Sequence, residues 1–128
     1  MNPYDAVHAL GKALQDSPEY KSFQEAQAVL KKDASAREML IDFRTMQLNL
    51  QKQQLTGLEV APEQEEKLEK LYQVIGMNLT VKRFLEAEYR LGVLLQDVQK
   101  IISEAIGDLF DPDLFGLSDE ADSEAGDS

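Results

Sequence analysis

A long apolar pattern near the C-terminal end of the chain constrains the fold more than any other feature. Over residues 78–106, apolar side chains recur at alternating steps of three and four without a proline. This spacing predicts one long helix with one apolar face. Such a helix would measure roughly 43 Å, whereas a compact domain of about 100 residues is only about 34 Å across. We therefore expect it to extend beyond a compact monomer and to favour self-association. The pattern consists of Val81, Phe84, Leu91, Leu95, Val98, Ile102 and Ala105.

Four shorter helices are predicted before it. The first covers residues 3–15 and the third covers residues 34–56. The second begins at residue 18 and the fourth at residue 62. Ser17 and Asp33 are expected as N-caps, and Gly57 as the residue that ends the third helix. Gly76 and Asn78 indicate a helix stop and a new start, and a continuous kinked helix is the alternative. Sustained alternation typical of strands is absent. The sequence thus predicts an all-α, dimer-forming bundle of about five helices with a long C-terminal helix.

Charge separates the chain into a nearly balanced body and an acidic tail. The net charge is −11, but eight of the 24 acidic residues follow Gly107, and no Lys or Arg does. The other 16 acidic residues face 13 basic ones, so the body carries about −3. We assign residues 1–107 to a helical bundle domain and 108–128 to a tail that we expect to be disordered. A body without a basic stripe and a tail that repels phosphates disfavour direct binding of nucleic acid.

The composition also bears on where the protein works. The chain has no cysteine, which excludes disulfides, thiolate nucleophiles, cysteine-ligated iron–sulfur clusters and sulfur-ligated zinc, and suits a reducing cytosol. The first residues lack a basic region followed by an apolar core, and no apolar run reaches the roughly 18 to 20 residues that span a bilayer. We therefore expect a cytoplasmic protein with no membrane contact.

The third predicted helix carries two apolar faces. Most of its apolar side chains fall within an arc of roughly 120°, while Ile41, Leu48 and Leu55 form a separate narrow strip. Either the helix lies centrally in its own bundle, or the second strip meets another subunit. The residues predicted to mediate self-association, as a homodimer or a higher homo-oligomer, are Ile41, Leu48, Leu55, Phe84, Leu91, Leu95, Val98 and Ile102.

Two residues interrupt the apolar face of the long helix. Glu88 falls between Phe84 and Leu91, where we expect it to pair with Arg or Lys or to specify register rather than to catalyse. Gly92 lies inside the helix, where glycine costs about 1 kcal/mol relative to alanine. It is expected either to permit close approach of another helix or to mark a slight bend.

Candidate catalytic chemistry is sparse. His8 is the only histidine, and no nucleophile or second imidazole can be named beside it, so we interpret it as a surface or packing residue. The glycines are isolated rather than clustered in a phosphate-binding loop. We predict no catalytic, cofactor-binding or metal-ligating residue. A small-ligand-binding or metal-binding bundle enzyme that uses buried carboxylates is the alternative.

The tail mixes large apolar residues with acids between Leu109 and Leu117. The apolar side chains could fold back as a cap on the end of the bundle, with the remaining residues as solvating charge. Alternatively they form a short acidic docking motif that becomes ordered on a protein partner. The residues of this motif would be Phe110, Leu114, Phe115 and Leu117.

The order and spacing of several short segments, over about 100 residues, carry a family resemblance. The chain resembles the YheA/YmcA/YlbF-like group of small bacterial helical proteins, the YheA-like branch most. The resembling segments include Ser17-Pro18-Glu19-Tyr20-Lys21, Leu40-Ile41-Asp42-Phe43, Gln54-Leu55-Thr56-Gly57 and Phe84-Leu85-Glu86-Ala87-Glu88-Tyr89-Arg90-Leu91.

The resemblance implies a cytoplasmic helical bundle of Gram-positive bacteria that forms homodimers or larger assemblies and has no known enzymatic activity. Relatives in the YlbF and YmcA branches are accessory factors in competence, sporulation and biofilm development, associated with ribonuclease Y and messenger-RNA maturation. Some of their assemblies hold iron–sulfur clusters ligated by cysteine. The present chain has no cysteine, so the cluster is not carried over.

Overall fold

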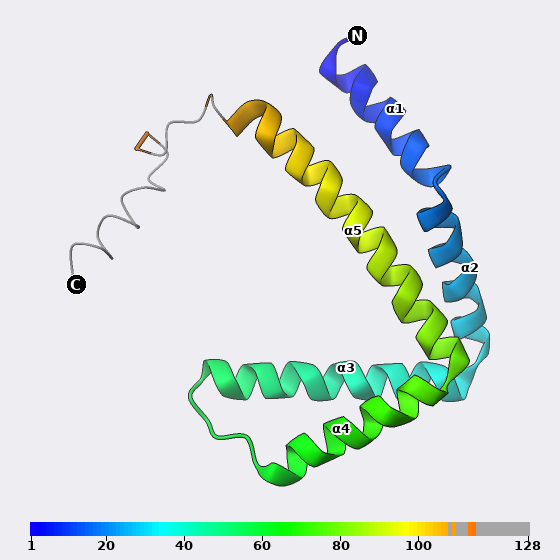
Figure 1. Cartoon of the computed structure of the whole chain (residues 1–128), viewed down its shortest axis with the longest axis vertical. Helices are drawn as coiled ribbons and strands as arrows, with labels where there is room; N and C mark the ends of the chain where they lie inside the picture. Colours follow the sequence, from blue (N-terminus) through cyan, green and yellow to red (C-terminus); the bar gives the residue numbers. More distant parts are fainter. Residues whose placement is uncertain (108, 110–112, 115–128) are drawn as a thin grey trace. The chain divides into compact units, whose positions relative to one another are not determined.

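The computed structural model describes residues 1–107, 109 and 113–114, and its elements are α-helices (Figure 1). They are α1 (Pro3–Gln15), α2 (Pro18–Lys32), α3 (Ala34–Leu55), α4 (Pro62–Met77) and α5 (Leu79–Gly107). No strand occurs among the described residues. The all-α fold with a long final helix is therefore confirmed. The chain divides into two compact units, Met1–Leu91 and Gly92–Ser128.

Side chains cap the starts of the first three helices. The Asp5 amide donates to Asn2 Oδ1 at 2.8 Å, the Tyr20 amide to Ser17 Oγ at 3.2 Å, and the Ala36 amide to Asp33 Oδ1 at 3.0 Å. Each bond satisfies a backbone donor that has no partner within the helix. The predicted N-caps Ser17 and Asp33 are confirmed, and they fix where α2 and α3 begin.

The end of α3 depends on Gly57, which has a left-handed backbone. Gly57 has φ 79°, a conformation that only glycine adopts without strain. Its amide donates to Gln54 O at 3.3 Å, and the amide of Leu58 donates to Gln53 O at 2.9 Å. This pair of bonds is a Schellman motif, which satisfies two carbonyls of the last turn and reverses the chain toward α4.

A single residue separates α4 from α5, and it breaks the helix rather than kinking it. Asn78 has an extended backbone with ψ 108°. Its amide donates to Ile75 O at 3.0 Å, which closes α4. Its Oδ1 accepts from the Val81 amide at 3.0 Å and its carbonyl from the Lys82 amide at 3.0 Å, which opens α5. Of the two alternatives for this junction, the break is correct.

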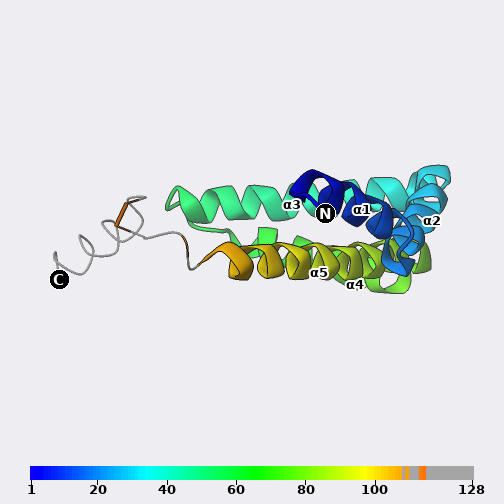
Figure 2. The same ribbon diagram turned by 90° about the horizontal axis from the view of Figure 1, so that it is seen from above.

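The core lies in the first unit, where α2, α3, α4 and the beginning of α5 meet. Figures 1 and 2 show α3 and α4 as neighbouring antiparallel helices joined by the loop after Gly57. The rings of Phe23 and Phe84 join α2 to α5, with centroids 5.3 Å apart. The buried cluster consists of Leu30, Ala36, Leu40, Phe43, Ile75, Val81 and Phe84. Helix α1 contributes no buried residue.

Of the residues predicted for self-association, Phe84 differs from the others in its burial. Its side chain is buried in the core of its own unit, against Phe23 and below the guanidinium of Arg44. The periodicity placed Phe84 on the apolar face of the long helix but could not tell which part of that face α2 and α3 cover. Its surface is thus already covered within one chain.

Within the second unit, the described helix is residues 92–107 of α5. None of its side chains is buried, and only Leu94, Val98 and Gly92 are half-buried. Lys100 and Glu104 form an exposed ion pair at 4.0 Å along the helix. The large apolar side chains of this segment are therefore mostly exposed.

Candidate interaction surfaces

An exposed apolar strip runs along α3. We call Ile41, Leu48 and Leu55, which follow one another at seven-residue spacing, the α3 strip. Their side chains are 53%, 51% and 86% exposed, while Ala36, Leu40, Phe43 and Leu50 are buried on another face. Both predicted faces exist. Within residues 1–91 the chain covers only one of them, and what covers the α3 strip stays a prediction.

A second exposed surface follows α5. We call Leu91, Leu95, Val98 and Ile102 the α5 stripe. Leu91 and Val98 are half-buried, and Leu95 and Ile102 are 43% and 49% exposed. Ile106 extends this side of the helix, and the exposed Ile101 projects from a neighbouring side. Neither was among the predicted residues. The seven-residue step from Leu94 to Ile101 was the signal that could have found Ile101.

The acid inside the apolar face of α5 has a basic partner. Glu88 Oε1 accepts a hydrogen bond from Arg44 Nη2 of α3, and the two side chains are 41% and 46% exposed. The Arg44 guanidinium carbon lies 5.8 Å from the centre of the Phe84 ring. The expectation that Glu88 pairs with Arg or Lys is confirmed. The pair connects α3 to α5 at the edge of the core.

Three neighbouring hollows on the first unit share lining residues. They lie between α4 and α5, between α3 and α5, and between α3 and α4, with volumes of about 520, 530 and 280 Å³. We call the residues that these hollows share, Phe43, Gln47, Tyr72 and Leu85, the trough. The rings of Phe43 and Tyr72 lie 6.0 Å apart. Leu48 of the α3 strip lines the same surface.

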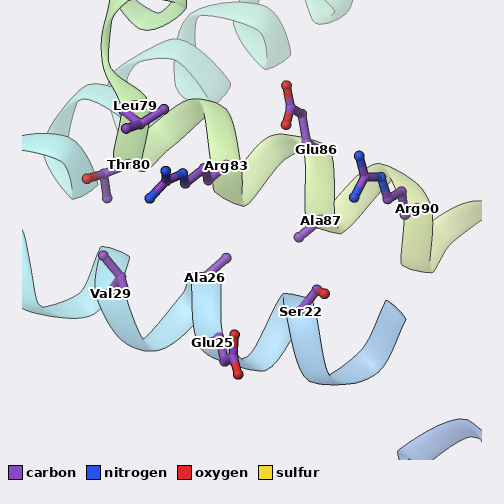
Figure 3. A pocket seen from close by; sticks show the side chains of 10 residues that line it. All are labelled: Ser22, Glu25, Ala26, Val29, Leu79, Thr80, Arg83, Glu86, Ala87 and Arg90. Atoms are coloured by element: carbon purple, nitrogen blue, oxygen red, sulfur yellow. The ribbon is translucent and has the colours of Figure 1, made fainter. Parts of the chain in front are cut away.

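A separate hollow of about 320 Å³ lies between α2 and the first turns of α5 (Figure 3). Ala26 and Ala87 point toward each other across it, while Glu86 points away from α2. Arg83 and Arg90 also line it, and neither forms an ion pair with another described residue. The small alanine side chains leave this space open.

The described residues offer little for metal or acid–base chemistry. His8 is exposed on α1. In this part of the chain no polar or charged residue is buried, and no three His, Cys, Asp or Glu side chains gather where they could hold a metal. The alternative of an enzyme with buried carboxylates therefore gains no support from residues 1–107. Nor is any described helix both long and apolar enough to cross a bilayer.

The predicted docking motif of the tail lies mostly beyond the described residues. Phe110, Phe115 and Leu117 belong to the part of the chain that is not described. Leu114 is described, and its side chain is exposed. The motif thus stays a prediction.

Comparison with known proteins identifies relatives over nearly the whole helical part. A family model described as "Control of competence regulator ComK, YlbF/YmcA" matches residues 4–107. A UPF0342 protein of Symbiobacterium thermophilum is 48% identical over 103 residues, which cover 80% of this chain and 92% of the relative. A UPF0342 protein of Caldicellulosiruptor saccharolyticus is 39% identical over 116 residues, or 91% of this chain and 95% of the relative.

A solved structure supports the fold. It is a protein of unknown function (DUF964) from Bacillus stearothermophilus, similar with a TM-score of 0.69. The match covers 83% of this chain and 93% of that one at 22% sequence identity. At this identity the likeness concerns the helical architecture alone.

Proposed function

Because this chain belongs to the YlbF/YmcA family, described by its control of the competence regulator ComK, we propose that it is a regulatory protein that acts through protein–protein contact. It works in the cytoplasm without catalysing a reaction. It self-associates through the α3 strip and the α5 stripe. Its role is similar to that of the accessory factors of bacterial development and messenger-RNA processing that it resembles.

The observation that carries this proposal is the pattern of exposed apolar side chains on α3 and α5. Single exposed leucines are common on any protein surface. Here they repeat at helical spacing, so that Ile41, Leu48 and Leu55 share one side of α3, and Leu95, Val98 and Ile102 share one side of α5. Ridges of this kind mark surfaces that another protein covers. Burying one leucine fully is worth roughly 1.5–3 kcal/mol, so each such residue offsets part of the cost of association.

A second copy of the chain is the simplest partner for these ridges. Homo-oligomers are the commonest assemblies of soluble proteins, and a twofold axis lets one surface cover itself. The acidic tail provides a further proposed contact, in which Phe110, Leu114, Phe115 and Leu117 dock onto a regulatory partner. The two contacts are independent, because removal of residues 108–128 leaves both ridges in place.

Sedimentation velocity of the full chain over a wide concentration range tests the self-association. We expect a dimer that dissociates on dilution, and Leu48→Asp shifts it toward the monomer because a buried charge lacks a partner. Asn49→Asp is the matched control, since it adds the same charge to a neighbouring exposed position outside the strip. A chain that remains a folded monomer at the highest concentration contradicts the proposal.

A further inference from the structure

We infer that the hollow between α4 and α5 is a docking site for an acidic segment of a partner protein, with one or two large apolar side chains among its carboxylates. This inference rests on the proposed role in protein–protein contact and names the chemistry of one partner. No residue of the α3 strip or the α5 stripe lines this hollow, so the site is separate from the proposed self-association. Three observations carry it: an apolar floor, two exposed tyrosine rings, and two cations without an ion pair.

The floor of the hollow is apolar. Ile75 of α4 is buried, Leu85 of α5 is half-buried, and both line the hollow. Gly76 lines it too and contributes no side chain, and a Cβ atom added to Gly76 would meet no atom within 4 Å. The volume of about 520 Å³ lies within the range of roughly 300–1,000 Å³ that is typical of ligand sites. The hollow therefore has room for apolar side chains from another molecule.

Two tyrosine rings border the hollow, Tyr72 from α4 and Tyr89 from α5. Both side chains are more than three-fifths exposed. The ring of Tyr72 also lies 6.0 Å from that of Phe43, which supports it from α3. Tyrosine combines a large apolar ring with a polar hydroxyl group, and it is enriched where proteins meet. Two such rings beside an apolar floor are therefore typical of a surface that a peptide covers.

The charged side chains of the hollow have a surplus of positive charge. Lys82 and Arg90 are exposed, and neither forms an ion pair with another residue of the range 1–107. Glu86 lies between them at steps of four residues along α5, so two cations face one carboxylate in the lining. The whole chain, in contrast, carries a net charge of −11. A partner carboxylate beside Lys82 or Arg90 gains an opposite charge, which selects an acidic segment over a basic one.

Aromatic rings beside cations also occur in proteins that bind single-stranded nucleic acid. Such proteins follow several phosphates with a continuous basic groove. The hollow between α4 and α5 has only two cations, with Glu86 between them, and the negative charge of the chain repels a polyanion. An acidic peptide with apolar side chains is the better match, because it gains from the floor and the tyrosine rings as well as from the cations.

Fluorescence anisotropy with labelled synthetic peptides tests the site on the full chain. The first peptide has aspartates around two leucines. One matched peptide has serines in place of the aspartates, and the other has alanines in place of the leucines. We expect saturable binding of the first peptide in the micromolar range and at least about tenfold weaker binding of each matched peptide. Absence of saturable binding up to about 1 mM, equal binding of all three peptides, or tighter binding of a labelled RNA oligonucleotide overturns the inference.

Two substitutions in the hollow and two matched controls locate the binding. Tyr89→Ala removes one ring, and Lys82→Glu reverses one charge. Each should raise the dissociation constant of the first peptide at least about tenfold. Neither should lower the melting temperature, because both side chains are exposed. The controls are Tyr4→Ala, at an exposed tyrosine of α1, and Arg83→Glu, at a residue that lines the other hollow beside α2. Both should bind as the natural chain does, and equal weakening by Lys82→Glu and Arg83→Glu would contradict the site.

Other occupants of the hollow give different results. If Tyr89→Ala shifts a dimer to monomer in sedimentation velocity, the hollow is a contact between copies and the inference is wrong. If Phe110→Ser in the full chain tightens peptide binding about tenfold or more, the acidic tail competes for the hollow and the inference is also wrong. If the peptide does not bind but the natural chain dimerises, the docking site fails and the proposed self-association stands. Peptide binding by a chain that stays monomeric has the opposite meaning.

Discussion

Arg44 of α3 and Glu88 of α5 form an ion pair directly beside the buried ring of Phe84. This ion pair is a polar contact between α3 and α5. Because both side chains are more than two-fifths exposed, water and salt screen their attraction. Its contribution to stability is therefore small, and the buried Val81 and Phe84 determine which face of α5 lies toward the core.

Glu88→Gln should lower the free energy of unfolding by about 0.2–1 kcal/mol, because an exposed pair contributes no more than this. Urea denaturation at low and high salt measures the change. The loss should shrink at high salt. Glu66→Gln, which breaks the more exposed pair with Lys70 at 3.2 Å, is the control and should cost less. If Glu88→Gln lowered the free energy of unfolding by several kcal/mol, the ion pair would have to be buried, which contradicts the exposed side chains of Arg44 and Glu88.

Leu95→Asp should raise the dissociation constant of the dimer without unfolding the monomer. Leu95 is 43% exposed in one chain, so the charge is solvated there, but self-association would remove it from water. Analytical ultracentrifugation measures the shift. Gln96→Asp, at the next exposed position, is the control and should associate normally. Equal association of the two variants would show that Leu95 lies outside the contact.

Phe84→Ala should lower the free energy of unfolding by about 3–5 kcal/mol, as expected for an aromatic side chain removed from a core. Phe23 loses its ring partner in the same variant. If the variant does not fold, Phe84→Leu provides a milder measurement in the same direction. Leu55→Ala, at an exposed position of the α3 strip, should change monomer stability by no more than about 0.5 kcal/mol. If Phe84→Ala and Leu55→Ala lowered the free energy of unfolding equally, the buried position of Phe84 and the exposed position of Leu55 would both be in question.

Asn78→Ala should destabilise the protein by about 1 kcal/mol, because the Val81 amide loses its acceptor at the start of α5. Asn78→Asp keeps a side-chain oxygen at that position and should retain most of the stability. Thermal unfolding followed by circular dichroism compares the three proteins. Equal melting temperatures for Asn78→Ala and the natural chain would argue against the cap.

The helix boundaries could be predicted from the sequence because their causes are local. Ser17, Asp33 and Gly57 act through backbone groups within four residues of themselves. A cap or a left-handed glycine needs no information from the rest of the chain. The two-faced character of α3 was also predictable, since helical projection separates Ile41 and Leu48 from the buried residues without reference to any partner.

The pairing of helices could not be predicted in the same way. Phe84 is covered because Phe23 of α2, far away in the sequence, lies against it. The trough depends on Phe43, Tyr72 and Leu85, which three different helices bring together. In the sequence each of these residues is an ordinary member of an amphipathic pattern. Periodicity gives the face of a residue but not the element opposite that face.

The single-residue connection at Asn78 has a mechanical consequence. A longer loop would let α4 turn while α5 stayed in place, but here one residue both closes the first helix and opens the second. A ligand that rotates α4 must therefore either carry the first turn of α5 with it or break the hydrogen bonds of Asn78. As long as the Asn78 cap holds, a rotation of α4 is therefore coupled to the first turn of α5.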